Sequence, residues 1–186
     1  MLAGPMSPTP APADPPSDDP AAVVSSRVLA ACRDDVYRAF ADPAVLARWW
    51  GPAGFANEFR AFDFRPGGAW RFVMRGPDGT AYELDKRFVA IDPGERIVLR
   101  HLDPAHGFEM TMTFADAPPA GTRLTWLMRF DDPAEADRVR PHVLAANEQN
   151  FDRLAAELAA APTAPAAGPT VGRSASRKQG VPDQGE

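Results

Sequence analysis

Residues 108–130 read FEMTMTFADAPPAGTRLTWLMRF, and this stretch decides the fold. Apolar side chains recur at every second position of its first half, at Phe108, Met110, Met112 and Phe114. This period of two is typical of a β-strand with one buried face. Pro-Pro-Ala-Gly at 118–121 separates it from a second alternating run at 123–130. The stretch therefore predicts two antiparallel strands joined by a short turn.

The same alternation extends back to Phe55, interrupted by turn sequences at 66–68, 76–79 and 92–95. About six consecutive strands with short connections predict an antiparallel meander. Residues 23–32 predict one further strand. Two short helices should follow it, the first capped by Asp34 or Asp35 and the second begun by Asp42-Pro43 and ended by Gly51-Pro52.

A long helix should close the domain. Asp132-Pro133-Ala134-Glu135 resembles a capping sequence, and we expect Pro141 to interrupt or restart the helix before it continues to Ala161. Its apolar stripe contains Val143, Leu144, Phe151, Leu154 and Leu158. The apolar face of the sheet needs a cover, and this helix is the only long element available. The sequence therefore predicts an α+β fold, a curved antiparallel sheet of six to seven strands around a long C-terminal helix.

Composition limits the classes of function. The chain has 186 residues, a net charge of −5 and one cysteine. The Pro- and Ala-rich segment 1–22 and the segment 162–186 are predicted to be disordered tails around a single domain at 23–161. An acidic balance argues against nucleic-acid binding, and no segment resembles a membrane span or a secretory signal. We expect a cytoplasmic protein without cofactor or metal, in which Cys32 is a buried apolar residue.

Several motifs then point to a family: Trp49-Trp50-Gly51-Pro52, residues 63–70 (DFRPGGAW), Ile91-Asp92-Pro93, and residues 150–154 (NFDRL). With them the chain resembles the START/Bet v 1-like (SRPBCC) superfamily. More narrowly, it resembles bacterial proteins named for the activator of Hsp90 ATPase, which are often labelled polyketide-cyclase-like. The resemblance covers residues 23–161. It implies the helix-grip fold, in which the sheet and the long helix enclose a hydrophobic cavity.

The more aromatic and methionine-rich phase of each strand is assigned to this cavity, together with residues of the helices. Trp49 and Trp50 point about 100° apart, so one should anchor the short helix to the sheet and the other should lie at the cavity mouth. The expected ligand-binding residues are Trp50, Trp70, Phe72, Met74, Tyr82, Leu84, His101, Met110, Met112, Trp126, Met128, Asn147 and Phe151.

Asn147 lies at the centre of the apolar stripe, where its amide needs a hydrogen-bond partner. That partner is either a ligand or pocket water, or another group of the protein. Asn147 and Glu148 also stand near a place where many relatives carry an aromatic residue. His101 shares the phase of Ile97 and Leu99, and Tyr82 is preferred over Glu83 as the inward-facing residue.

Three functions stay open. The first is a binding protein for a small hydrophobic or aromatic molecule. The second is a cyclase- or hydrolase-like enzyme whose acid–base groups come from His101, Tyr82 or Glu83, although the chain has no nucleophile, metal or phosphate motif. The third is a protein-interaction module that resembles a chaperone ATPase activator. A homodimer is compatible with any of the three.

Overall fold

The computed structural model describes residues 18–160, which form one sheet and three helices. In chain order the elements are β1 (Ala22–Leu29), α1 (Arg33–Ala41), α2 (Pro43–Trp49), β2 (Ala56–Phe62), β3 (Ala69–Arg75), β4 (Ala81–Asp92), β5 (Arg96–His101), β6 (Phe108–Ala117), β7 (Gly121–Phe130) and α3 (Pro133–Ala160). This confirms the predicted α+β helix-grip architecture. The predicted tails lie almost wholly outside the described residues. The described chain starts a little before the predicted domain, and Asp19 forms an ion pair with Arg129 at 2.7 Å.

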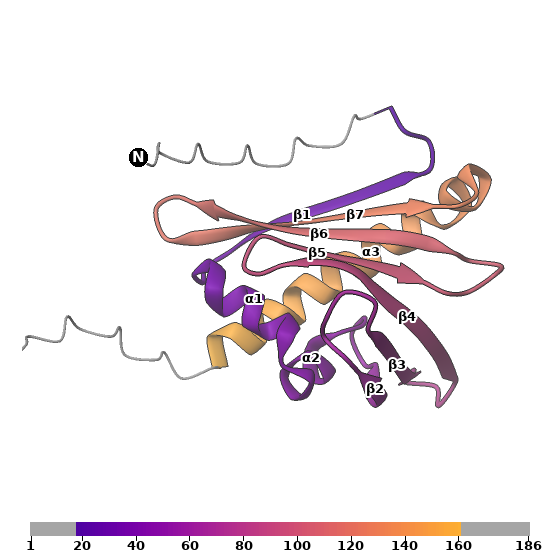
Figure 1. The fold of residues 1–186 in the computed structure, drawn as a ribbon, viewed down its shortest axis with the longest axis horizontal. Helices are drawn as coiled ribbons and strands as arrows, with labels where there is room; N and C mark the ends of the chain where they lie inside the picture. The colour runs from indigo at the N-terminus through magenta and orange to yellow at the C-terminus, as the bar shows by residue number, and fades with distance from the viewer. Residues whose placement is uncertain (1–17, 161–186) are drawn as a thin grey trace, which may run out of the picture.

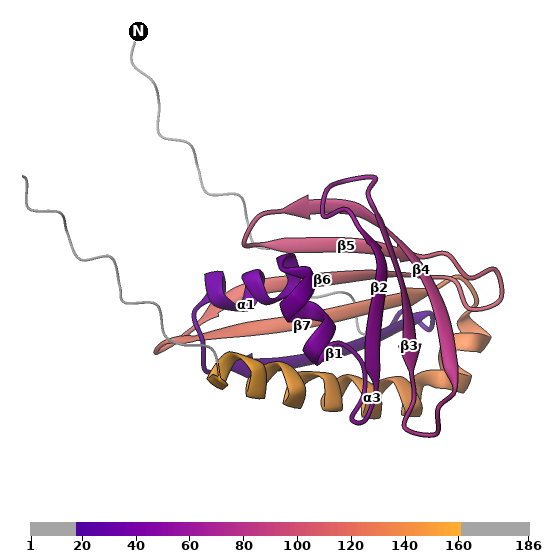
Figure 2. The same ribbon diagram turned by 90° about the horizontal axis from the view of Figure 1, so that it is seen from below.

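The seven strands form one antiparallel sheet in the order β1-β7-β6-β5-β4-β3-β2. Strands β2 to β7 are the predicted meander, and β1 joins it beside β7. The sheet bends strongly, so that β2, β3 and β4 run steeply across the direction of β1, β6 and β7 (Figure 2). The register shifts between Phe59 and Ala61 and between Phe88 and Ala90. Such bulges increase the local twist and bend a strand.

All three helices lie against one face of the sheet, which we call the inner face (Figures 1 and 2). Helix α2 begins as predicted, because the Asp42 carboxylate accepts hydrogen bonds from the Ala44 and Val45 amides and Pro43 occupies the first turn. The predicted cap of α1 is wrong. Cys32 is the N-cap and makes no capping side-chain bond, whereas Asp34 and Asp35 lie inside the first turn. There they still favour the helix by their charge.

Helix α3 runs without interruption through Pro141, so the expected break is wrong. A proline inside a helix costs about 3 kcal/mol, because it removes one backbone hydrogen bond and its ring clashes with the preceding turn. Packing on both sides of the proline outweighs it, because Val139 and Val143 both pack against the core. Arg140 also ties the helix to the strand side, donating to the Pro20 and Ala22 carbonyls at 3.0 and 2.7 Å. At the start of α3, Asp132 caps the Ala134 amide, while Glu135 pairs with Arg138 and His106.

Candidate functional site

The strand register fixes which side chains share the inner face, since residues directly opposite each other in paired strands point to the same side. One row of partners runs Trp70, Lys86, His101, Phe108 and Phe130 across β3 to β7. Next to it on one side runs the row Phe72 and Leu84, and on the other the row Phe88, Leu99, Met110 and Met128. Met112 and Trp126 form a further pair. The strand residues expected at the cavity therefore do share one face.

Trp50 connects this face to helix α3 through its backbone. The Asn57 amide donates to the Trp50 carbonyl at 2.6 Å, and the Asn150 amide oxygen accepts from the Gly51 amide at 2.7 Å. The Arg153 guanidinium donates to the carbonyls of Gly51 and Pro52 at 2.8 and 2.9 Å. It also donates to the carbonyl of Arg48 at 2.6 Å. We call Asn57, Asn150 and Arg153 the Trp50 clamp. Two of the sequence motifs, 49–52 and 150–154, thus meet here.

The clamp requires glycine at position 51. Gly51 has a φ of 98°, in the left-handed region that side chains disfavour. A Cβ at this position would also lie 3.1 Å from the Met74 sulfur. Arg153 has no carboxylate partner among residues 18–160, and burial lowers its pKa. Its role is therefore to pair the carbonyls at the end of α2, of which Pro52 also accepts from the Phe55 amide.

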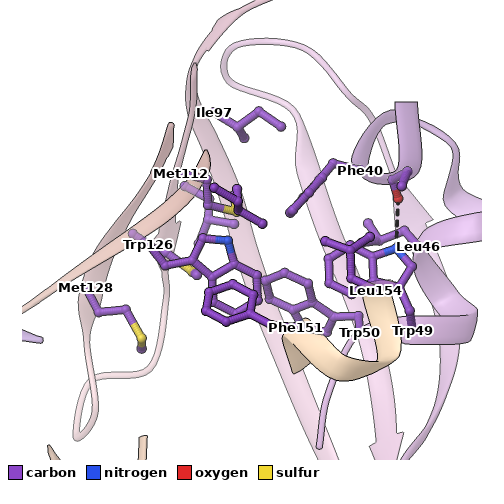
Figure 3. Packing of buried hydrophobic residues seen from close by; sticks show 14 of the residues in the cluster. Phe40, Leu46, Trp49, Trp50, Ile97, Met112, Trp126, Met128, Phe151 and Leu154 are labelled. Atoms are coloured by element: carbon purple, nitrogen blue, oxygen red, sulfur yellow. Dashed lines mark hydrogen bonds between the residues drawn. The ribbon is translucent and has the colours of Figure 1, made fainter. Parts of the chain in front are cut away.

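The two adjacent tryptophans have different surroundings, as the sequence predicts. Trp49 is 1% exposed and its Nε1 donates to the Ala39 carbonyl at 3.0 Å, which anchors α2 to α1 (Figure 3). Trp50 points toward the inner face, where its ring lies 5.0 Å from the Trp70 ring and 5.3 Å from the Trp126 ring. At 6% exposed, Trp50 is buried among rings, so the expected position at an open mouth is wrong.

The most unusual residue of the inner face is Lys86, which the sequence analysis missed. Its side chain is only 5% exposed, and no carboxylate or other acceptor of residues 18–160 pairs with it. Its Nζ instead faces aromatic rings, 5.3 Å from the Trp50 centroid, 5.4 Å from Phe108, 5.6 Å from Trp70 and 6.0 Å from Phe72. These distances are within cation–π range. We call Lys86, His101 and these four rings the Lys86 cluster.

Burial perturbs both titratable groups of the cluster. Loss of hydration lowers the pKa of Lys86 from 10.5 to about 8. His101 lies opposite Lys86 in the register and against the Phe108 ring, with 5.0 Å between centroids. Burial, helped by the nearby Lys86 charge, lowers the pKa of His101 to about 4. At neutral pH the cluster therefore holds a neutral imidazole beside a lysine that is still largely protonated.

Several buried polar atoms have no partner within the described part of the chain. Three of them belong to inner-face residues: Trp70 Nε1, Trp126 Nε1 and His101 Nδ1. The fourth is Asn57 Oδ1, whose amide group donates to two carbonyls of the clamp region. Native interiors pair nearly all of their buried polar groups, so unpaired ones mark places that need an explanation. Two of the three inner-face atoms are indole N–H groups, which can only donate.

Asn147, in contrast, has a partner. It is 6% exposed, and its Nδ2 donates to the Ser25 hydroxyl on β1 at 3.0 Å and lies 3.9 Å from the Met128 sulfur. The sequence leaves open whether the Asn147 amide bonds to a ligand or pocket water, or to another group of the protein. The hydrogen bond to Ser25 supports the second role. The bond ties α3 to β1, and Phe151, one turn further along α3, packs on Trp126 at 4.7 Å between centroids.

The acid–base candidates do not come together. Tyr82 shares the phase of Leu84 and Lys86, but it lies near the start of β4, is 48% exposed and packs on Phe55. Glu83 is exposed on the opposite face. Tyr82 is four positions from Lys86 along β4, which corresponds to about 13 Å of strand, so it lies far from His101, which lies opposite Lys86 in the register. Cys32 is exposed as well, so its expected burial is wrong.

Two open hollows occur on the described surface, and both lie away from the inner face. One, of about 350 Å³, is lined by Asp34, Tyr37, Arg38, Pro93 and Gly94. The other, of about 330 Å³, lies between residues 32–33 and 116–121. Neither contains an expected ligand-binding residue. No three metal-ligating side chains gather within residues 18–160.

No helix between residues 18 and 160 combines the length and the apolar character that crossing a bilayer requires.

The sequence contains a pattern that indicates the burial of Lys86. Residues 85–87 (DKR) look like a charged, solvated segment, and this hides the period of two. Tyr82, Leu84, Lys86 and Phe88 nevertheless form one continuous phase. An aromatic or aliphatic residue on each side of a lysine in that phase indicates a buried lysine.

Comparison with known proteins identifies the family. The family model of activator of Hsp90 ATPase homolog 1-like proteins matches residues 30–161. Among curated proteins no match is found. A solved protein from Chromobacterium violaceum is 28% identical, with a TM-score of 0.64 over 73% of this chain and 95% of that one. A protein from Nitrosomonas europaea is 19% identical, with a TM-score of 0.70 over 78% and 98%.

A third solved structure, the AHSA1 protein of Silicibacter pomeroyi, is 23% identical, with a TM-score of 0.62 over 75% of this chain and 98% of that one. At such identities the last two structures establish the shared fold. The family match spans the whole sheet beyond β1, both short helices and α3. The chain therefore belongs to the family of activator of Hsp90 ATPase homolog 1-like proteins.

Proposed function

We propose that this protein binds a small, mainly apolar molecule between the inner face of the sheet and helix α3. The observation that carries the proposal is the set of unpaired polar atoms on an otherwise apolar inner face: Trp70 Nε1, Trp126 Nε1 and His101 Nδ1. Binding sites for small molecules combine apolar and aromatic walls with a few polar groups that fix orientation. A ligand would give these atoms the partners that the protein does not.

Room for the ligand would come from methionine side chains. Met74, Met110, Met112 and Met128 all project from the strands onto this face. Methionine has three rotatable bonds and adapts its shape at low cost, which is why it lines binding surfaces that accept varied ligands. The rigid part of the site is the Trp50 clamp, which holds Trp50 by its backbone while its ring borders the interior.

An enzymatic role has weaker support. Acid–base chemistry needs groups within hydrogen-bond reach of each other or of one reacting atom. His101 is buried, whereas Tyr82 and Glu83 are exposed. A partner-binding role, which the family name suggests, would need a large exposed apolar surface. Val24, Val28 and Val89 are exposed on the strands, but no contact in the structure indicates what would cover them.

The experiment uses the neutral fluorescent probe N-phenyl-1-naphthylamine and protein labelled with ¹³C at its methionine methyl groups. The chain has six methionines. Four project onto the inner face, and Met1 and Met6 lie outside the described residues. We expect the probe to bind saturably and to shift the signals of the inner-face methyls while those of Met1 and Met6 stay unchanged. Absence of binding, or binding without any shift of the four inner signals, would overturn the proposal. Native mass spectrometry of the protein from cells would then look for the natural ligand.

A further inference from the structure

We infer that Lys86 is the anchor for an anionic head group, so that the natural ligand is an apolar molecule carrying a carboxylate or a similar single anion. This inference rests on the proposed function and names its ligand class. The starting observation is that Lys86 is a buried cation without a counter-charge in residues 18–160. Buried charges in proteins are normally paired or hydrogen-bonded, because the loss of hydration is costly.

A second cation within residues 18–160 that lies over a ring of this core, Arg27, shows the difference. Arg27 of β1 lies 5.6 Å from the centroid of Phe151, and it forms ion pairs with Glu148 and Asp152 of α3. Its charge is therefore compensated within the protein and is 29% exposed to solvent. Lys86 has neither an ion pair with residues 18–160 nor a comparable exposure to solvent. Rings alone offset only part of the lost hydration of an ammonium group.

The polar surroundings of Lys86 contain one fixed donor, an indole N–H, and no buried carboxylate among residues 18–160. Opposite Lys86 stands His101, with a free Nδ1, and on the other side Trp70, with a free Nε1–H donor. Within residues 18–160 no Asp or Glu side chain is buried. Asp85 and Arg87, the neighbours on β4, point to the exposed outer side of the strand. A bound carboxylate would meet the ammonium group of Lys86 and the indole N–H of Trp70, and would face no buried like charge within residues 18–160.

The surrounding walls indicate that the rest of the ligand is apolar. Trp50, Phe72 and Phe108 border the ammonium group. Leu99, Met110 and Met128 lie in the adjacent row of the sheet. A free inorganic ion would gain nothing from these walls and would lose its own hydration on entry. An anion attached to an aromatic or aliphatic body gains from both parts of the site.

Two probes with one ring skeleton separate the charge from the body. 8-Anilinonaphthalene-1-sulfonate carries a sulfonate, and N-phenyl-1-naphthylamine lacks it. Fluorescence titrations compare the wild type, Lys86→Met, and the control Arg87→Met, which removes a cation from the next residue on the opposite face. We expect Lys86→Met to weaken the sulfonate probe at least about tenfold, the effect of one buried charged contact. The neutral probe should change less than about threefold, and Arg87→Met should alter neither.

A second readout needs no substitution. The chain has only two lysines, Lys86 and Lys178, so lysine ¹³C labelling gives two side-chain signals. The sulfonate probe should shift the Lys86 signal and raise the Lys86 pKa, and the neutral probe should leave the pKa where it was. Equal affinity of wild type and Lys86→Met for the sulfonate probe, with an unmoved Lys86 signal, would overturn the anchor role. If the neutral probe still bound at the methionines, the proposed function would survive that result.

The remaining outcomes are also decisive. If neither probe bound the wild type, the proposed function and the anchor role would both fail. If inorganic phosphate displaced the sulfonate probe at equal concentration, the site would take a bare ion, and the claim of an apolar body would be wrong.

Discussion

Trp50 separates two regions that treat buried polar groups in opposite ways. On its backbone side, the Trp50 clamp uses Asn57, Asn150 and Arg153 to pair the polar groups at the end of α2. On its ring side, an imidazole nitrogen and an indole N–H of the Lys86 cluster have no partner among residues 18–160. The Lys86 ammonium group faces rings and forms no ion pair with these residues. The two regions share Trp50 but differ in depth, because Asn57 and Arg153 are half-buried whereas Lys86 and His101 are buried. Asn57 Oδ1 is the one unpaired buried atom on the clamp side within residues 18–160.

The comparison separates stability from binding. A paired buried group contributes to folding, and the same group unpaired costs on the order of 1–3 kcal/mol. The clamp should therefore be a source of stability, and the Lys86 cluster a cost that the rest of the core offsets. Because the fold tolerates these unpaired polar groups in the absence of a ligand, the same groups are available to bind a ligand.

The largest effect is expected in the clamp. Arg153→Met removes hydrogen bonds to the carbonyls of Arg48, Gly51 and Pro52. The Pro52 carbonyl keeps the Phe55 amide as a donor, whereas the carbonyls of Arg48 and Gly51 lose the donor that the structure gives them. Unfolding in urea should show a loss of about 3 kcal/mol, because each hydrogen bond to a charged group contributes roughly 1.5–3 kcal/mol and the three are not independent. Arg48→Met is the control, since its ion pair with Glu157 is largely exposed. Equal losses for both variants would mean that the clamp does not hold α2.

The next effect has the opposite sign. Lys86→Met replaces an unpaired buried cation by an apolar side chain of similar length, so the ligand-free protein should gain about 2 kcal/mol at pH 7. Arg87→Met, on the outer face of the same strand, should leave stability unchanged. The same urea titrations measure both. A clear loss of stability for Lys86→Met would show that the lysine has a stabilising partner, and the contrast between the two regions would fail.

The pH dependence sharpens this result. The pKa of Lys86 in the folded protein is about 8 and lies below its unfolded value of 10.5. Between these values the unfolded chain binds more protons, so stability rises with pH through this window and the cost of the charge is present in full below it. A shift of this size corresponds to roughly 3 kcal/mol. The stability gap between Lys86→Met and wild type should therefore close from pH 8 toward 10.5. A gap that is constant over this range would contradict the assignment.

The smallest effect concerns Asn147 at the other end of the inner face. Asn147→Leu leaves the Ser25 hydroxyl without its partner and should cost about 1 kcal/mol. A double-mutant cycle with Ser25→Ala, followed by thermal unfolding, isolates the bond. A coupling energy near zero, with Asn147→Leu as stable as the wild type, would favour a ligand-binding role for Asn147 over the structural one.

The sequence predicts the architecture well, because period two and helical spacing report which face of each element is buried. It also predicts that Asp42-Pro43 begins α2 and that Trp49 and Trp50 have different surroundings. It fails where tertiary contacts outweigh local preference. Pro141 does not break α3, because Val139, Arg140 and Val143 hold the helix on both sides.

The candidate site was predictable only in part. Strand phase predicts which aromatic and methionine side chains face inward, but it does not predict which side chains contact each other. No pattern along the chain shows that Asn147 meets Ser25 across 122 residues, or that His101 lies opposite Lys86. Lys86 itself was hidden between Asp85 and Arg87, because a charged tripeptide usually lies in solvent, and only the phase of its strand indicates otherwise.

The central claim is that Lys86 is a buried ammonium group without a counter-charge from residues 18–160, and its own titration tests this most directly. In ligand-free protein with ¹³C-labelled lysines, the side-chain signal of Lys86 is followed from pH 6 to 11, with Lys178 as the second signal. The account predicts a Lys86 pKa of about 8. A Lys86 pKa at or above the ordinary value of about 10.4 would contradict it, because the lysine would then be hydrated or already paired.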